Sequence, residues 1–191
     1  DLATFSMIKK HLVSNDEFHN MIQQLNKKQM DLFNSIARHI QEIKHQPNST
    51  EPMFLFLTGG AGVGKSFLVK TISEYAFRQL KFPKQNLDQP SLMLTASSGK
   101  AAAGINGLTL HSAFYLYGCR TINPKHLSDL RNKYKYLKLL VIDEISMIGN
   151  KTFEHLHDNL SLIMENDSPF GGVSILAVGD FYQLNPVGQE P

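Results

Sequence analysis

The sequence has little of several features that would assign a protein class at once. It has a single cysteine, Cys119, in 191 residues, so an internal disulfide cannot form and a reducing, intracellular location is the default expectation. No apolar run approaches the roughly 20 residues that a membrane span needs, which predicts no membrane partner. The formal net charge is only +2, which neither demonstrates nor excludes a nucleic-acid partner. The chain does not begin with methionine and has no signal-peptide pattern, so we expect a fragment.

The composition is that of a globular domain. Hydrophobic residues make up 42% of the chain and charged residues 19%, enough for one domain with a sizeable core and a small extra element. Residues 1–24 are weakly amphipathic and are interpreted as a helical lead-in. Residues 25–191 are predicted to form the domain itself, with a clear apolar stripe at three- and four-residue steps over 26–45.

Apolar runs and helical patterns alternate along the rest of the chain. The first run, MFLFLT at 53–58, is typical of a strand that is buried on both faces. This alternation predicts a parallel, doubly wound α/β sheet. The other predicted strands are 91–96, 138–145 and 173–178; the predicted helices are 65–80, one or two short helices in 99–117, 125–136 and 151–164.

The segment GGAGVGKS at 59–66 fits the phosphate-loop pattern, since it follows a predicted strand and opens a predicted helix. Glycines allow successive backbone N–H groups to curl around an anion, and the helix N-terminus adds partial positive charge. Lys65 would reach the β- and γ-phosphates of ATP, and the Ser66 hydroxyl would bind Mg²⁺. A glycine-rich turn with a chance lysine is the alternative. The predicted nucleotide-binding residues of this segment are Gly60, Ala61, Gly62, Val63, Gly64, Lys65, Ser66 and Phe67.

The run LLVIDEIS at 139–146 is an apolar strand that ends in two acids. Beside a phosphate loop, Asp143 would hold Mg²⁺ as the acidic partner of Ser66. Glu144 could polarise a water in line with the γ-phosphate, which favours hydrolysis over transfer to an acceptor. The alternative is that both acids only cap the following helix.

Six motifs stand in a fixed order and together resemble the superfamily-one DNA helicases, especially the PIF (petite-integration-frequency) helicases, including those of Helitron transposons. The likeness covers about residue 25 to the end. The motifs are LNKKQ at 25–29, GGAGVGKS at 59–66, TASSGKAA at 95–102, GLTLHSAF at 107–114, VIDEISM at 141–147 and VGDFYQLNPV at 178–187.

The resemblance implies that the fold is the first RecA-like motor domain of a 5′-to-3′ helicase, with ATP and Mg²⁺ as cofactors. Gln29 would contact the adenine. Gln183 would sense the γ-phosphate, because an amide can bond to a phosphate oxygen without adding negative charge. Asp180 would help to organise the metal and its waters. A second RecA-like domain, elsewhere in the parent chain, would complete the motor.

The resemblance also implies that two of the motifs line a path for single-stranded DNA. The resemblance also implies a monomeric, intracellular protein that serves genome maintenance or transposition; in a eukaryote the expected location is the nucleus, and the mitochondrion stays open as a second location. The implied DNA-binding residues are Thr95, Ser97, Ser98, Gly99, Lys100, His111 and Phe114.

Two other functions stay open on the residues alone. One is a phosphate-loop NTPase or kinase that acts on a small molecule, for which DNA would not change turnover. The other is a non-catalytic scaffold that binds nucleotide, which would tolerate the loss of Glu144. The retention of Lys65, Ser66, Asp143 and Glu144 together disfavours a dead site.

Overall fold

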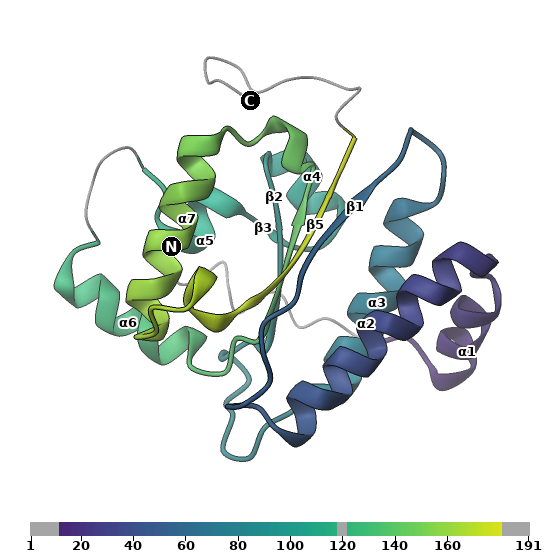
Figure 1. The fold of residues 1–191 in the computed structure, drawn as a ribbon, viewed down its shortest axis with the longest axis horizontal. Helices are drawn as coiled ribbons and strands as arrows, with labels where there is room; N and C mark the ends of the chain where they lie inside the picture. The colour runs from purple at the N-terminus through teal and green to yellow at the C-terminus, as the bar shows by residue number, and fades with distance from the viewer. Residues whose placement is uncertain (1–11, 118–121, 181–191) are drawn as a thin grey trace.

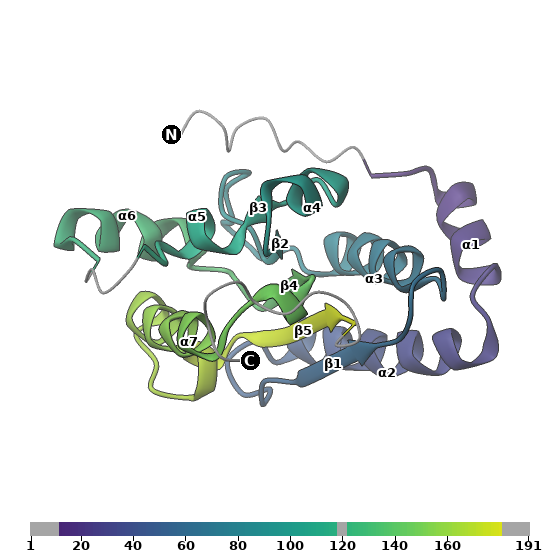
Figure 2. The same ribbon diagram turned by 90° about the horizontal axis from the view of Figure 1, so that it is seen from above.

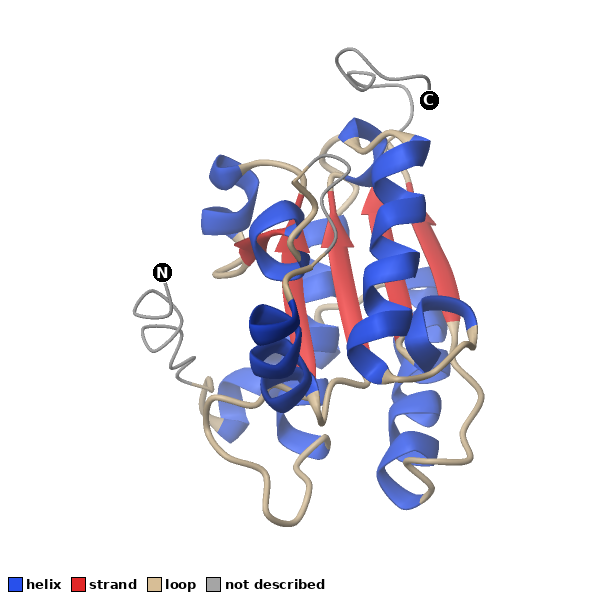
Figure 3. Ribbon diagram, turned by 90° about the vertical axis from the view of Figure 1, so that its left-hand side faces the viewer, coloured by secondary structure: helices blue, strands red, loops and turns tan. Residues whose placement is uncertain are grey.

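A single parallel sheet forms the centre of the computed structural model, which describes residues 12–117 and 122–180. The strands are β1 (Phe54–Thr58), β2 (Leu92–Ala96), β3 (Leu108–Thr109), β4 (Leu139–Asp143) and β5 (Ser174–Gly179), in the spatial order β1-β5-β4-β2-β3. Every pair is parallel, and the arrows of the long strands point the same way in Figure 3. The carboxyl ends of the strands therefore share one edge of the sheet, where ligands of open α/β folds bind.

Helices cover both faces of the sheet. On one side lie α1 (Asn15–Gln23), α2 (Lys27–His45) and α3 (Lys65–Gln79), to the right of the strands in Figures 1 and 2. On the other lie α5 (Leu110–Phe114), α6 (Pro124–Tyr134) and α7 (Asn150–Met164), to the left in both views. The short α4 (Gly99–Gly104) connects β2 to β3. The result is the three-layer arrangement that parallel strands with helical crossovers produce.

The alternation of side chains along each strand creates two cores. In β4, Leu139 and Val141 pack against the face that carries α2 and α3, whereas Leu140 and Ile142 pack against the face that carries α6 and α7. The interior strands are therefore buried along nearly their whole length and are mostly apolar, as expected of strands covered on both faces. This double burial fixes the register and so the positions of the residues that follow each strand.

The predicted elements agree closely with the observed ones, and the differences are local. The two-residue β3 and the 3-10 turns at Ile145–Met147 and Pro169–Gly172 were not predicted, because such short segments show no periodicity. The predicted strand 138–145 ends earlier, at Asp143, since Glu144 has left-handed backbone angles (φ 53°, ψ 42°). Within the lead-in 1–24, the described part holds α1.

The prediction that β1 is buried on both faces is wrong. Phe54 is 46% exposed and Phe56 is 44% exposed, while Leu55 and Leu57 are partly buried against the core. The reason is topological: β1 pairs with β5 and forms the outermost strand of the described sheet. An apolar run in the sequence predicts that a strand is largely buried. Whether both of its faces are covered depends on the position of the strand in the sheet.

Candidate active site

The loop after β1 has the backbone conformation of an anion-binding turn. Gly62 (φ 77°) and Gly64 (φ 85°) are left-handed, and Gly64 forms the N-cap of α3. A Cβ atom on Gly64 would be strained by the left-handed backbone and would lie 2.7 Å from Nε2 of Gln29, whose side chain would have to move. The loop therefore presents its N–H groups and the start of α3 at the carboxyl edge of the sheet.

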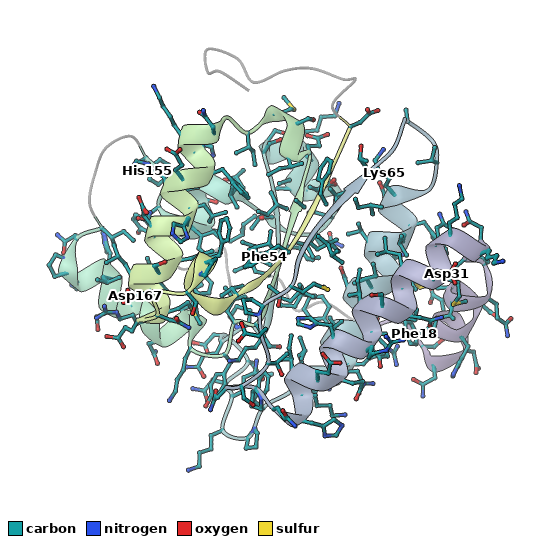
Figure 4. All side chains as sticks on the ribbon, in the orientation of Figure 1. Phe18, Asp31, Phe54, Lys65, His155 and Asp167 are labelled. Carbon is teal, nitrogen blue, oxygen red and sulfur yellow. The ribbon has the colours of Figure 1, made fainter. Side chains whose placement is uncertain are left out.

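The positively charged side chain of the site, Lys65, directly follows this loop. Nζ of Lys65 donates hydrogen bonds to the carbonyl of Gly59 and, at 2.9 Å, to the carbonyl of Gly60. Figure 4 shows Lys65 where the loop joins α3. Ser66, the next residue of the helix, is exposed. Both side chains are thus placed at the first turn of α3, where a bound phosphate would meet the helix N-terminus.

The two acids lie at the end of β4, which is separated from β1 by β5 along the same edge of the sheet. Oδ1 of Asp143 accepts a 2.9 Å hydrogen bond from the backbone N–H of Glu144. Burial raises the pKa of Asp143 above its ordinary value, and the neighbouring Lys65 charge opposes that shift. Asp143, at the end of β4, and the phosphate loop, after β1, lie at the same carboxyl edge of the sheet. The left-handed backbone at Glu144, unusual for a non-glycine residue, turns its side chain away from the strand direction.

Gln29 also lies at the phosphate loop. Its Oε1 accepts from the N–H of Asn26 at 3.0 Å, while Oδ1 of Asn26 accepts from the N–H of Gln29 at 3.0 Å, which is a capping box at the start of α2. Nε2 of Gln29 approaches the carbonyls of Val63 and Gly64 at 3.3 and 3.5 Å. Sequence reasoning missed the capping role, although the spacing of Asn26 and Gln29 carries that signal.

The end of β5 lies between the phosphate loop after β1 and the acids at the end of β4. A Cβ atom on Gly179 would lie 2.8 Å from Cγ2 of Ile145 and 3.2 Å from the N of Ser146, so glycine allows the strand to approach the turn after Glu144. Asp180 follows at once and is buried, 6% exposed. The predicted sensor Gln183 lies outside the described residues.

The segment between β2 and α4 adjoins Glu144. In the register of β2 and β4, Ala96 is paired with Asp143, and the N–H of Ser97 donates to the carbonyl of Asp143 at 3.3 Å. Oγ of Ser97 donates to Oε2 of Glu144 at 3.3 Å. Sequence reasoning did not foresee this contact, because the strand order and register alone bring the two residues together.

The remaining residues of the implied DNA path fall into two groups. Gly99 and Lys100 are exposed, and Ser98 and His111 are partly exposed; Oγ of Ser98 also caps α4 by accepting from the N–H of Ala101. Such groups can meet a phosphate chain.

Thr95 and Phe114 are buried, so the expected contacts with DNA are corrected for both. Thr95 is 0% exposed and its hydroxyl donates to the carbonyl of Val141 at 2.8 Å, inside the sheet. Phe114 is 0% exposed and packs on the ring of Tyr134, with centroids 5.2 Å apart. Both side chains point into the interior of the domain. They therefore stabilise the segment that carries the exposed residues of the motif.

These features define a class of protein. A parallel sheet with a glycine loop, lysine and serine after one strand and a carboxylate pair after another is a phosphate-loop NTPase of the RecA-like kind. Among residues 12–117 and 122–180, no helix is long and apolar enough to cross a membrane.

Comparison with known families makes the assignment specific. The family model of the PIF1-like helicases matches residues 24–191, and the chain belongs to that family. The ATP-dependent DNA helicase RRM3 of Saccharomyces cerevisiae is 38% identical over 142 residues, which cover 71% of this chain and 19% of the relative. The ATP-dependent DNA helicase PIF1 of Emericella nidulans is 37% identical over 139 residues, covering 70% and 18%. The resemblance drawn from the six motifs is confirmed.

Solved structures agree. The Pif1 helicase of Candida albicans superposes with a TM-score of 0.65 at 30% identity, over 85% of this chain and 34% of that one. A Bacteroides Pif1 helicase in complex with ADP-AlF3 and single-stranded DNA gives 0.57 at 29% identity, over 79% and 33%. The predicted α/β RecA-like fold is confirmed. The chain spans about a fifth of the length of these curated relatives and about a third of these solved chains.

Proposed function

We propose that this chain is the ATP-binding and ATP-hydrolysing motor domain of an ATP-dependent DNA helicase that moves 5′-to-3′ along single-stranded DNA. One observation carries the proposal: Lys65 and Ser66 at the start of α3 and Asp143 and Glu144 at the end of β4 lie at the carboxyl edge of one sheet, and Ser97 donates a hydrogen bond to Glu144. The proposed site for ATP and the proposed surface for DNA would therefore adjoin each other. The direction of movement is supported by the family alone.

The phosphate loop and the acids divide the chemistry of hydrolysis between them. Lys65 and the N–H groups of residues 60–67 would bind the phosphates of ATP. The Ser66 hydroxyl and the Asp143 carboxylate are oxygen ligands of the kind that Mg²⁺ prefers, and would hold it together with phosphate oxygens and water. When bound, Mg²⁺ neutralises charge on the transferred phosphate. Glu144 would orient the attacking water, with Asp180 and Gln183 completing the polar surround.

Gln29 would read the adenine. Its amide already bonds to Asn26 and the loop carbonyls, so nucleotide binding would exchange part of that set for contacts with the base. The capping box keeps the side chain at the loop in the meantime, which reduces the entropy lost on binding.

The DNA would lie over the exposed or partly exposed polar groups of Ser97, Ser98, Gly99, Lys100 and His111. Hydroxyls, a backbone N–H and one ammonium suit phosphate contacts that do not depend on base sequence. Thr95 and Phe114 would act only by holding this segment in shape, as their burial indicates.

The wider assembly follows from the family. The relatives extend well beyond the matched region, and we propose that a second RecA-like domain of the parent chain completes the ATP site and the DNA path. We further propose that the protein is monomeric and, in a eukaryote, acts in the nucleus and in mitochondria. Repair, recombination and telomere maintenance, or transposition, are the processes that such a motor serves.

The test is ATP hydrolysis by the full-length protein with and without single-stranded DNA, with Lys65→Ala as the control. We expect strong stimulation by DNA, and a loss of at least about 100-fold in the control because the β- and γ-phosphates lose their cation. An ATP hydrolysis rate that does not change with DNA would refute the helicase proposal and favour an NTPase or kinase that acts on a small molecule. Nucleotide binding without any turnover would indicate a scaffold.

A further inference from the structure

A hydrogen bond joins the DNA-facing segment to the residue that activates water. Oγ of Ser97 lies 3.3 Å from Oε2 of Glu144 and 3.6 Å from the sulfur of Met147. Ser97 directly follows β2, and Glu144 directly follows β4. The two side chains are neighbours because Ala96 and Asp143 end the paired register, so the contact is built into the sheet.

The backbone around both residues is fixed. The N–H of Ser97 donates to the carbonyl of Asp143, and the N–H of Glu144 donates to the side chain of Asp143. Glu144 is held in the left-handed region, and the end of β5 at Gly179 packs on the turn that follows it. With both backbones constrained, the freedom that remains lies in the Ser97 hydroxyl and the Glu144 carboxylate.

The Ser97 hydroxyl has one proton to donate. It can give that proton to the Glu144 carboxylate or to a phosphate oxygen of DNA, but not to both. The neighbouring hydroxyl differs, since Oγ of Ser98 accepts from the N–H of Ala101 and is oriented by the cap of α4. The hydroxyl of Ser97, in contrast to that of Ser98, donates its hydrogen bond to a residue of the proposed ATP site, Glu144.

We infer that Ser97 is a positioning residue that restrains Glu144 in the absence of DNA and releases it when a DNA phosphate takes the hydroxyl proton. The inference rests on the proposed function, and it identifies how DNA would stimulate that site. While bonded to Ser97, Oε2 of Glu144 is turned toward the DNA segment and is not free to accept a proton from an attacking water. DNA binding would remove this competing partner, and Glu144 would turn toward the γ-phosphate.

The experiment measures ATP hydrolysis by the full-length protein, with and without single-stranded DNA, in Ser97→Ala and Ser97→Thr. Loss of the hydroxyl should raise the DNA-free rate roughly fivefold, the scale of one typical hydrogen bond, so that the ratio of the DNA-bound rate to the DNA-free rate falls. Ser97→Thr retains the hydroxyl and should keep the ratio of the wild-type protein. Ser49→Ala removes an exposed hydroxyl that donates to Gln46, in the segment before the start of β1 and so away from the strand end that carries the phosphate loop, and is the matched control.

A further variant separates the restraint from a general change in structure. In the background of Glu144→Gln, Ser97→Ala should have no additional effect on the DNA-free rate. If Ser97→Ala unfolds, Ser97→Val and Ser97→Thr give the same comparison with side chains of equal shape. A DNA-free rate in Ser97→Ala that stays at or below the wild-type rate would overturn the restraint, as would a threonine variant that behaves like alanine.

Failure of the inference and failure of the proposed function give different results. If the wild-type protein shows no stimulation by DNA, the helicase proposal falls and the restraint falls with it. If the wild-type protein is stimulated and Ser97→Ala retains the same ratio of rates, the restraint alone is refuted.

Discussion

The phosphate loop at 59–66 and the segment at 95–114 both follow a strand at the same edge of the sheet, yet they use their residues in opposite ways. The proposed phosphate-binding role of the loop depends on its backbone, which contains left-handed glycines. The proposed DNA-binding role of the segment depends on side chains, and two of those that its motifs mark are buried at 0% exposure. A binding site that uses backbone groups can therefore be predicted from residue types in the sequence. A binding site that uses side chains can be predicted only when it is known which face of the structure each residue occupies.

The largest expected effect concerns the buried residues of the segment at 95–114. Phe114→Ala should lower the free energy of unfolding by about 3–5 kcal/mol, because it removes a fully buried ring that packs on Tyr134. Urea denaturation measures this, with Phe54→Ala as the matched control, since Phe54 is 46% exposed and should cost about 1 kcal/mol or less. Weakened DNA binding in a Phe114→Ala protein of normal stability would show instead that the ring contacts DNA.

A smaller effect is expected in the loop, where the comparison predicts sensitivity to backbone conformation. Gly64→Ala should cost about 1–2 kcal/mol of unfolding free energy without nucleotide, because alanine at φ 85° is strained and its Cβ displaces the Gln29 amide. Gly60→Ala is the control from the same loop: no atom lies within 4 Å of its added Cβ, and its φ is not left-handed. Equal costs in the two variants, measured by chemical denaturation, would show that the conformation of Gly64 is not what the loop requires.

The smallest effect tests the exposed half of the segment. Lys100→Ala in the full-length protein should weaken single-stranded DNA binding by several-fold and reduce the slope of log K against log salt by about 0.7, the share of one phosphate contact. The measurement is a salt titration of affinity. Lys44→Ala, which removes an exposed lysine near the end of α2, should leave both values unchanged. An unchanged slope in Lys100→Ala would remove Lys100 from the DNA path.

Within the fold, the prediction succeeded where periodicity or apolar runs were long. The 19-residue α2 matches the predicted helix because its apolar stripe is long. The interior strands match the predicted apolar runs because both of their faces are covered. It failed for β1, whose two exposed phenylalanines, Phe54 and Phe56, lie on the outermost strand of the described sheet. Strand order is a property of the whole chain, and no local window of sequence contains it.

The sequence by itself determined the phosphate loop, the acidic strand end and the family, because each depends on residue types at fixed local spacing. Lys65 and Ser66 had to follow a glycine turn, and Asp143 and Glu144 had to end a strand, wherever those strands lay in the sheet. Only the tertiary structure decided that β2 lies beside β4 in a register that pairs Ala96 with Asp143. That register sets the Ser97 hydroxyl against Glu144, and the packing of the second core removes Phe114 from the surface. Contacts between residues 47 positions apart arise from parallel pairing, which spacing along the chain cannot encode.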